Sequence, residues 1–73
     1  MLENLRALRE DKDIKQKDMA KLLDVHQTTY SDYELGRLNI PIDTLIKLAN
    51  YFDTSVDYLV GLTDEITPYP RKK

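Results

Sequence analysis

QKDMAKLLDVHQTTYSDYELG, residues 16–36, contains two helical patterns separated by one short turn. Met19, Ala20 and Leu23 recur at the spacing of a single buried stripe, which predicts a helix of about two turns over residues 16–23. Polar and charged residues occupy the other positions of this segment. The first helix of the pair should therefore bury one face against its neighbours and expose the other.

The second pattern covers residues 26–35, where Tyr30 and Tyr33 continue the helical period. We expect both tyrosines to pack in the core, and stacking on a ligand is the less favoured alternative. Gly36 follows as the kind of residue that ends a helix in a left-handed conformation. Asp24 stands in the turn between the two helices, where a left-handed backbone costs about 1 kcal/mol more for aspartate than for glycine. The turn is therefore feasible without a glycine.

Three further helices complete the pattern, over residues 2–12, 42–52 and 56–60. Pro41 precedes the helix at 42 at a position where its missing N–H is harmless, and Thr54 or Ser55 can cap the last helix. No segment alternates polar and apolar residues in the manner of a strand. We therefore predict an all-α fold: a compact five-helix domain with a helix-turn-helix at its second and third helices. The expected core comprises Leu2, Leu5, Leu8, Met19, Ala20, Leu23, Val25, Tyr30, Tyr33, Leu45, Leu48, Ala49, Phe52 and Leu59.

Length and composition limit the number of domains and the cellular location that we expect. We assign residues 1–62 of the 73 to one helix-turn-helix domain, and residues 63–73, which have prolines but no period, to a flexible C-terminal tail. No apolar run approaches the ~20 residues of a membrane span, and the opening lacks the apolar segment of a signal peptide. The chain has no cysteine and hence no disulfide framework. We expect a cytoplasmic protein with no membrane role.

Charge is distributed unevenly along a chain whose net charge is −2. Residues 1–23 carry six basic and five acidic side chains, whereas residues 38–65 carry one lysine against five acids. Affinity for nucleic acid comes largely from lysine and arginine side chains that neutralise phosphates. An anion-binding face should therefore belong to the first half of the chain or to the basic tail, Arg71, Lys72 and Lys73, although that tail can also be only a solubilising end.

Residues 4–60 resemble the Cro/cI and Xre-like family of bacterial and phage helix-turn-helix regulators. The matching elements are Gln16, Ala20, Val25, the Tyr33-Glu34-x-Gly36 ending of the third helix, Pro41, Leu48-Ala49 and the closing pattern Ser55-Val56-Asp57-Tyr58-Leu59. The resemblance implies a lambda-repressor-like fold and a sequence-specific DNA-binding transcriptional regulator. It further implies a repressor that binds double-stranded DNA at a palindromic operator as a homodimer, with the third helix in the major groove.

The resemblance also implies roles for single residues. Base edges would be contacted at the start of the third helix and one turn later, by Gln27, Thr28, Ser31 and Asp32. Phosphates would be contacted by Gln16, Lys17, His26, Arg37 and Asn39, with an outer base as the alternative for Gln16. Arg9 and Glu34 match a pair that forms a buried or half-buried salt bridge between the first helix and the end of the third.

Side-chain chemistry supports the base contacts independently of the family. Glutamine can pair bidentately with adenine, and threonine offers a hydroxyl together with a methyl that suits the thymine methyl group. Gln27 and Thr28 therefore suit a half-site that contains A·T pairs. Without the family pattern, two solvated surface residues are an equally good interpretation of these positions.

Lys15 and His26 depart from the family pattern, and Asp32 carries a charge that phosphates repel. Lys15 stands where the family commonly has a serine or threonine cap worth about 1 kcal/mol, and Asp18 in the first turn offsets part of that loss. His26 opens the third helix, where it can accept a bond from a backbone amide or, when protonated, approach a phosphate. Asp32 can contact cytosine, lie just clear of the groove, or mark a domain that has lost DNA binding. We favour the second interpretation because base contacts concentrate at the start of the recognition helix.

Two other classes of function are alternatives to DNA binding. A protein-interaction module, such as an antitoxin or a regulator partner with weak DNA binding, is suggested by residues 15–37, where four basic and four acidic side chains balance. An enzyme is not expected, since His26 and the carboxylates form no nucleophile–base constellation. With one histidine and no cysteine, we expect no metal and no cofactor. For a two-fold contact between copies, the candidate residues are Tyr51, Tyr58, Val60 and Leu62.

Overall fold

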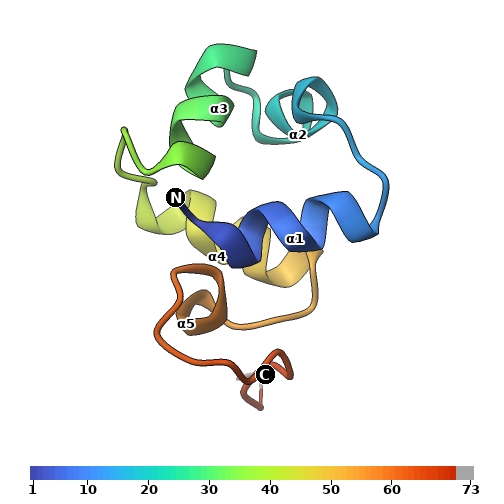
Figure 1. Ribbon diagram of the computed structural model, residues 1–73, viewed down its shortest axis with the longest axis vertical. Helices are drawn as coiled ribbons and strands as arrows, with labels where there is room; N and C mark the ends of the chain where they lie inside the picture. The colour runs from blue at the N-terminus through green and yellow to red at the C-terminus, as the bar shows by residue number, and fades with distance from the viewer. Residues whose placement is uncertain (71–73) are drawn as a thin grey trace.

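The computed structural model describes residues 1–70, which form five α-helices and contain no strand (Figure 1). The helices are α1 (Glu3–Asp11), α2 (Gln16–Leu23), α3 (Gln27–Leu35), α4 (Ile42–Tyr51) and α5 (Val56–Leu59). The all-α, five-helix prediction is confirmed, and the helix ends differ from the predicted ones by at most one residue. Where they differ, the predicted end residue stands at the cap position, as His26 does before α3 and Phe52 does after α4.

Left-handed residues end the helices and keep the connections short. Asp24 ends α2 with φ 57° and Gly36 ends α3 with φ 74°, as the sequence predicts. Asp13 and Asp53 adopt the same conformation after α1 and α4, with φ 60° and 53°, which the sequence analysis did not predict. Aspartate tolerates this region because its short polar side chain can hydrogen-bond locally. The chain therefore turns sharply at these points with only two glycines.

The helices pack around a core to which all five contribute. α3 contacts both α2 and α1, and α5 contacts both α1 and α4. Figure 1 shows α2 and α3 together at one end of the long axis, α1 and α4 across the middle, and α5 with the C-terminal segment toward the other end. The buried apolar side chains are Leu5, Leu8, Met19, Ala20, Tyr30, Tyr33, Leu48, Ala49, Phe52 and Leu59. Four residues predicted for the core are only half-buried: Leu2, Leu23, Val25 and Leu45.

Residues 63–70, here called the strap, run back along α5 without regular secondary structure. The buried hydroxyl of Thr54 donates a hydrogen bond to the Ile66 carbonyl, and the Tyr69 hydroxyl donates to the Asp57 carboxylate over 2.9 Å. These contacts hold the strap at the end of the molecule opposite α2 and α3. The domain boundary at residue 62 and the flexibility of the tail stay predictions, and the basic residues 71–73 lie outside the described part of the chain.

Candidate nucleic-acid interface

α3 has one buried face and one polar face. Tyr30 and Tyr33 are 0% and 5% exposed and fix the helix against the core. On the other face, Gln27 and Thr28 are exposed, and the residues one turn later, Ser31 and Asp32, are half-buried. Side chains four positions apart share a face of a helix. The four predicted base-contact residues therefore stand together on a helix whose back is anchored in the core.

The amino ends of α2 and α3 lack side-chain caps. Lys15 and His26 occupy the two N-cap positions in extended conformations, and neither side chain accepts a hydrogen bond from the helix that follows. The His26 imidazole therefore does not cap α3, and approach to a phosphate stays the predicted alternative for this side chain. Free amide groups and the helix dipole make a helix amino end favourable for anions. Both starts are thus suited to approach a phosphate.

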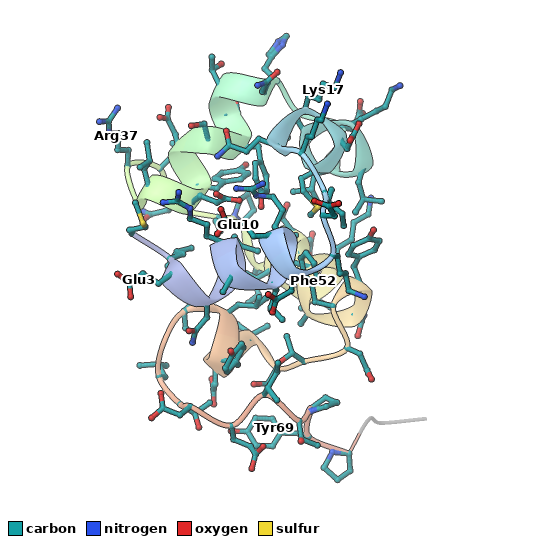
Figure 2. The ribbon with its side chains drawn as sticks, turned by 45° about the vertical axis from the view of Figure 1, so that its right-hand side comes forward. Glu3, Glu10, Lys17, Arg37, Phe52 and Tyr69 are labelled. Carbon is teal, nitrogen blue, oxygen red and sulfur yellow. The ribbon has the colours of Figure 1, made fainter. Side chains whose placement is uncertain are left out.

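The other predicted phosphate-contact residues surround this end of the molecule. Lys17, Arg37 and Asn39 are exposed, and Gln16 is half-buried. Figure 2 shows Lys17 and Arg37 reaching outward on either side of the α2–α3 end, with Tyr69 far from both. All of the predicted DNA-contact residues therefore lie on α2, on α3 or in the adjoining connections.

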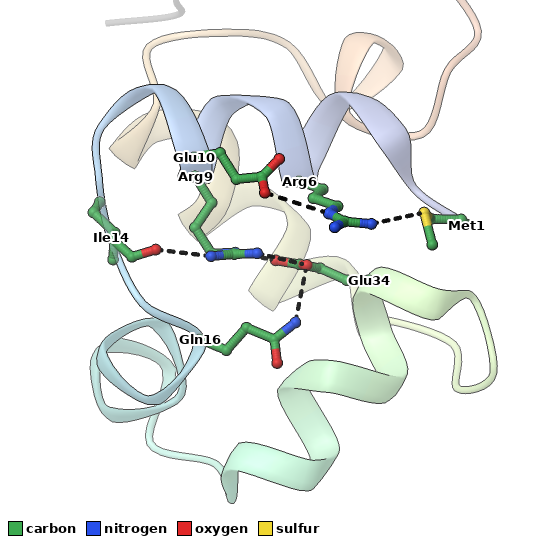
Figure 3. A network of polar contacts seen from close by, with 7 residues as sticks. All are labelled: Met1, Arg6, Arg9, Glu10, Ile14, Gln16 and Glu34. Atoms are coloured by element: carbon green, nitrogen blue, oxygen red, sulfur yellow. Dashed lines mark hydrogen bonds and ion pairs between the residues drawn. The ribbon is translucent and has the colours of Figure 1, made fainter.

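A buried ion pair ties α1 to the end of α3 (Figure 3). The Arg9 Nε lies 2.6 Å from Glu34 Oε2, Nη2 donates to Oε1 over 3.3 Å, and Nη1 donates to the Ile14 carbonyl over 2.8 Å. The side chains of Arg9 and Glu34 are 12% and 3% exposed. The backbone strengthens the same junction, since the Leu2 N–H donates to the Glu34 carbonyl over 2.7 Å. α3 is therefore held at its carboxyl end while its amino end stays open.

Gln16 joins this network from the first residue of α2. Its Nε2 donates to Glu34 Oε1 over 3.1 Å, as Figure 3 shows. A glutamine amide has two N–H donors, so the second remains available to a phosphate. The family pattern implies that Gln16 contacts a phosphate or an outer base, and it does not indicate this bond to Glu34. The structure thus links the start of α2 to the end of α3 through a single carboxylate.

The network changes the acidity of its members. Burial opposes ionisation of Glu34, but the hydrogen bond from Arg9, the nearby Tyr30 hydroxyl and the bond from Gln16 together outweigh it and lower the pKa of the carboxyl group. The hydrogen bond to Glu34 raises the pKa of the Arg9 guanidinium. Burial, followed by the neighbouring Glu34 carboxylate, raises the pKa of the Tyr30 phenol. Its hydroxyl is buried and has no hydrogen bond of standard geometry within residues 1–70. Arg9 and Glu34 therefore stay charged, and Tyr30 stays neutral, at physiological pH.

A second clamp fixes the helix pair from α4. Lys47 Nζ donates to the Leu22 carbonyl over 3.0 Å, at the carboxyl end of α2, where a cation is favourable to the helix dipole. No periodicity in the sequence pointed to this contact. The sequence offers one indication of this contact: Lys47 is the single basic residue between residues 38 and 70. The orientation of α2 and α3 therefore depends on residues of α1 and α4 as well as on the turn.

No group of three or more histidine, cysteine, aspartate or glutamate side chains within residues 1–70 could hold a metal ion. In the same part of the chain, no helix has the length and apolar character needed to cross a membrane.

Comparison with known proteins identifies the family. A family model described as helix-turn-helix matches residues 5–59. The chain belongs to this family, and the resemblance to Xre-like helix-turn-helix transcriptional regulators is confirmed.

Individual relatives carry the same description. Over 71 residues, 97% of the chain and 63% of the relative, the chain is 34% identical to the uncharacterised HTH-type transcriptional regulator YobD of Bacillus subtilis. It is 38% identical to the HTH-type transcriptional regulator ImmR of the same organism over 71% of the chain and 40% of that protein. A crystal structure of a transcriptional regulator from Listeria innocua has 38% identity and a TM-score of 0.78, over 89% of this chain and 61% of that one. The chain thus spans less than two thirds of each of these relatives.

Proposed function

We propose that the chain is a sequence-specific DNA-binding repressor that binds a palindromic operator as a homodimer, with α3 in the major groove. The observation that carries this proposal is the polar face of α3, where Gln27 and Thr28 are exposed on a helix anchored by Tyr30 and Tyr33. Such an arrangement presents base-reading side chains on a rigid element, as helix-turn-helix proteins require.

In this proposal, the residues divide between reading and positioning. Gln27 and Thr28 read base edges, and Ser31 and Asp32 border them one turn later. The second N–H of Gln16, with Lys17, His26, Arg37 and Asn39, contacts phosphates and fixes the register of α3 without reading sequence. The Arg9–Glu34 pair does not reach DNA in this proposal, because Glu34 is buried and the guanidinium of half-buried Arg9 is bonded to Glu34 and to the Ile14 carbonyl.

Selection of binding sites from random duplex DNA, at two salt concentrations, tests the proposal. A repeated motif with two inverted halves is expected, and log affinity should fall linearly with log salt. Gln27→Ala should reduce discrimination between the selected site and a site altered at one base pair by about 1–3 kcal/mol. Arg37→Ala should weaken binding to all duplexes alike, and Arg6→Ala, which removes an exposed arginine from α1, serves as its control. If neither Gln27→Ala nor Arg37→Ala changes affinity for any duplex, the proposed reading face is wrong.

A protein-interaction module with weak DNA binding is the second candidate. It is favoured by residues 48–70, which carry four acids and no lysine or arginine, and by the exposed apolar side chains Leu62, Ile66 and Tyr69 in the same segment. A stoichiometric complex with a protein that resists salt, together with no retention on DNA at low salt, would support this candidate over the first.

A further inference from the structure

One carboxylate oxygen of Glu34 is shared by donors from two different helices. Its Oε1 accepts from Arg9 Nη2 over 3.3 Å and from Gln16 Nε2 over 3.1 Å, whereas Oε2 accepts from Arg9 Nε over 2.6 Å. The Glu34 side chain is 3% exposed, and these bonds keep it ionised. An ionised carboxylate accepts hydrogen bonds and donates none. Gln16 must therefore face Glu34 with its NH2 group, because its own oxygen would be repelled there.

This bond fixes an amide that lies between the interior and the surface. Gln16 is half-buried and is the first residue of α2, whose start is left uncapped by the side chain of Lys15. Figure 3 shows the Gln16 side chain reaching from α2 to the Glu34 carboxylate. The carboxylate takes one N–H of the amide, and a glutamine amide has two. One donor of known orientation therefore remains beside the open start of α2.

A glutamine side chain without this bond would be a poorer partner for a phosphate. Its terminal amide has a broad rotational preference, and immobilising such a side chain on binding costs entropy. A free amide can also turn its oxygen toward a phosphate, which is unfavourable because both groups only accept hydrogen bonds. In this structure the ordering is complete when the protein folds, since Arg9 holds the Glu34 carboxylate in place. Gln16 is therefore preorganised.

We propose that Glu34 is a positioning residue for DNA binding, which holds the Gln16 amide so that its second N–H meets a phosphate of the duplex. This inference rests on the proposed function, which supplies the phosphate contact of Gln16. Glu34 then has two separable effects. Through Arg9 it stabilises the fold, and through Gln16 it adds affinity that does not depend on base sequence.

DNA affinity measured in two backgrounds tests the inference. Gln16→Met keeps the length of the side chain and removes its donor. In the wild type it should weaken binding to the selected duplex about tenfold, since hydrogen bonds to charged groups are among the stronger ones. The second background is Arg9→Met with Glu34→Leu, which removes the carboxylate without leaving a buried charge. There Gln16→Met should weaken binding about twofold or less, because the amide is no longer held.

Arg37→Ala is the matched control, because Arg37 is exposed and lies outside the Glu34 network. It should cost the same factor in both backgrounds and lower the slope of log affinity against log salt by about 1. Gln16→Met should leave that slope unchanged, because a neutral amide releases no counterion. It should also leave discrimination between duplexes unchanged, whereas a tilt of α3 would reduce it. Circular dichroism melts establish that each variant is folded.

A measurement on the free wild type does not depend on the folding of any variant. By ¹⁵N relaxation, the side-chain NH2 of Gln16 should be as rigid as the backbone of α2. A flexible amide overturns the inference. An equal loss for Gln16→Met in both backgrounds, or a loss of discrimination with it, also overturns the inference and leaves DNA binding standing. A wild type that binds no duplex at low salt overturns the proposed function together with the inference.

Discussion

The substitution Glu34→Gln removes one charge of a buried pair with little change in shape. Arg9, whose side chain is 12% exposed, is left with no carboxylate opposite its guanidinium, while its bond to the Ile14 carbonyl survives. Removal of one partner from a buried pair costs about 3–5 kcal/mol, and the retained hydrogen bonds place this variant near 3 kcal/mol. A domain of this size has a total stability of roughly 4–11 kcal/mol. The substitution should therefore remove a large part of the free energy of unfolding.

Urea denaturation followed by circular dichroism measures this loss directly. A thermal melt should show a midpoint lower by roughly 12–24 °C, since 1 kcal/mol corresponds to about 4–8 °C for a domain of this length. The double substitution Arg9→Met with Glu34→Leu should recover most of the stability, because it removes both buried charges together. It would not restore the bond between Gln16 and Glu34, so DNA affinity should stay below that of the wild type. A loss below about 1 kcal/mol for Glu34→Gln would refute the argument that the pair balances a buried charge.

Three further predictions concern acid, capping and the polar face of α3. The folded-state pKa of Glu34 lies below its unfolded value of about 4.3, so its contribution to stability is present above that pH and is lost as the pH falls through the folded pKa. The stability difference between wild type and Glu34→Gln, measured by urea titration at several pH values, should therefore shrink below about pH 4. Ser55→Ala removes the cap that accepts the Tyr58 N–H over 3.0 Å and should cost about 1 kcal/mol of unfolding free energy, whereas Ser31→Ala on the polar face of α3 should cost less. Asp32→Asn should strengthen binding to non-specific DNA by about 1 kcal/mol or less in a titration at low salt, and an unchanged affinity would place Asp32 clear of the phosphates.

Most of the fold could be predicted from local patterns. The apolar period of each segment located all five helices, and Asp24 and Gly36 marked the ends of the helix pair correctly. Assignments of helix ends succeeded where a capping side chain directly precedes a helical pattern, as with Ser55, one of the two candidate caps before α5. They failed at Asp13 and Asp53, because the left-handed conformation of an aspartate depends on how the chain must turn to pack the next helix.

The candidate site was predicted less completely. Position at the start of a helix identified Gln27 and Thr28 as exposed, and helical geometry puts Thr28 on the face opposite Tyr30. The bond from Gln16 to Glu34 and the clamp from Lys47 to the Leu22 carbonyl join residues 18 and 25 positions apart. Hydrogen bonds between segments so far apart leave no period in the sequence, so only the packed structure reveals them.

The sequence by itself therefore determined which helices form and which face of α3 is polar, because both follow from interactions over a few residues. Only the tertiary structure decided how α3 is held, through one buried carboxylate shared by Arg9 and Gln16. It also decided which apolar residues stay in solvent. Ile42 and Ile46 are as apolar as the residues of the core, but they are exposed because no other element packs over them. Burial is a property of the assembled helices, because it depends on contacts between segments that lie far apart in the sequence.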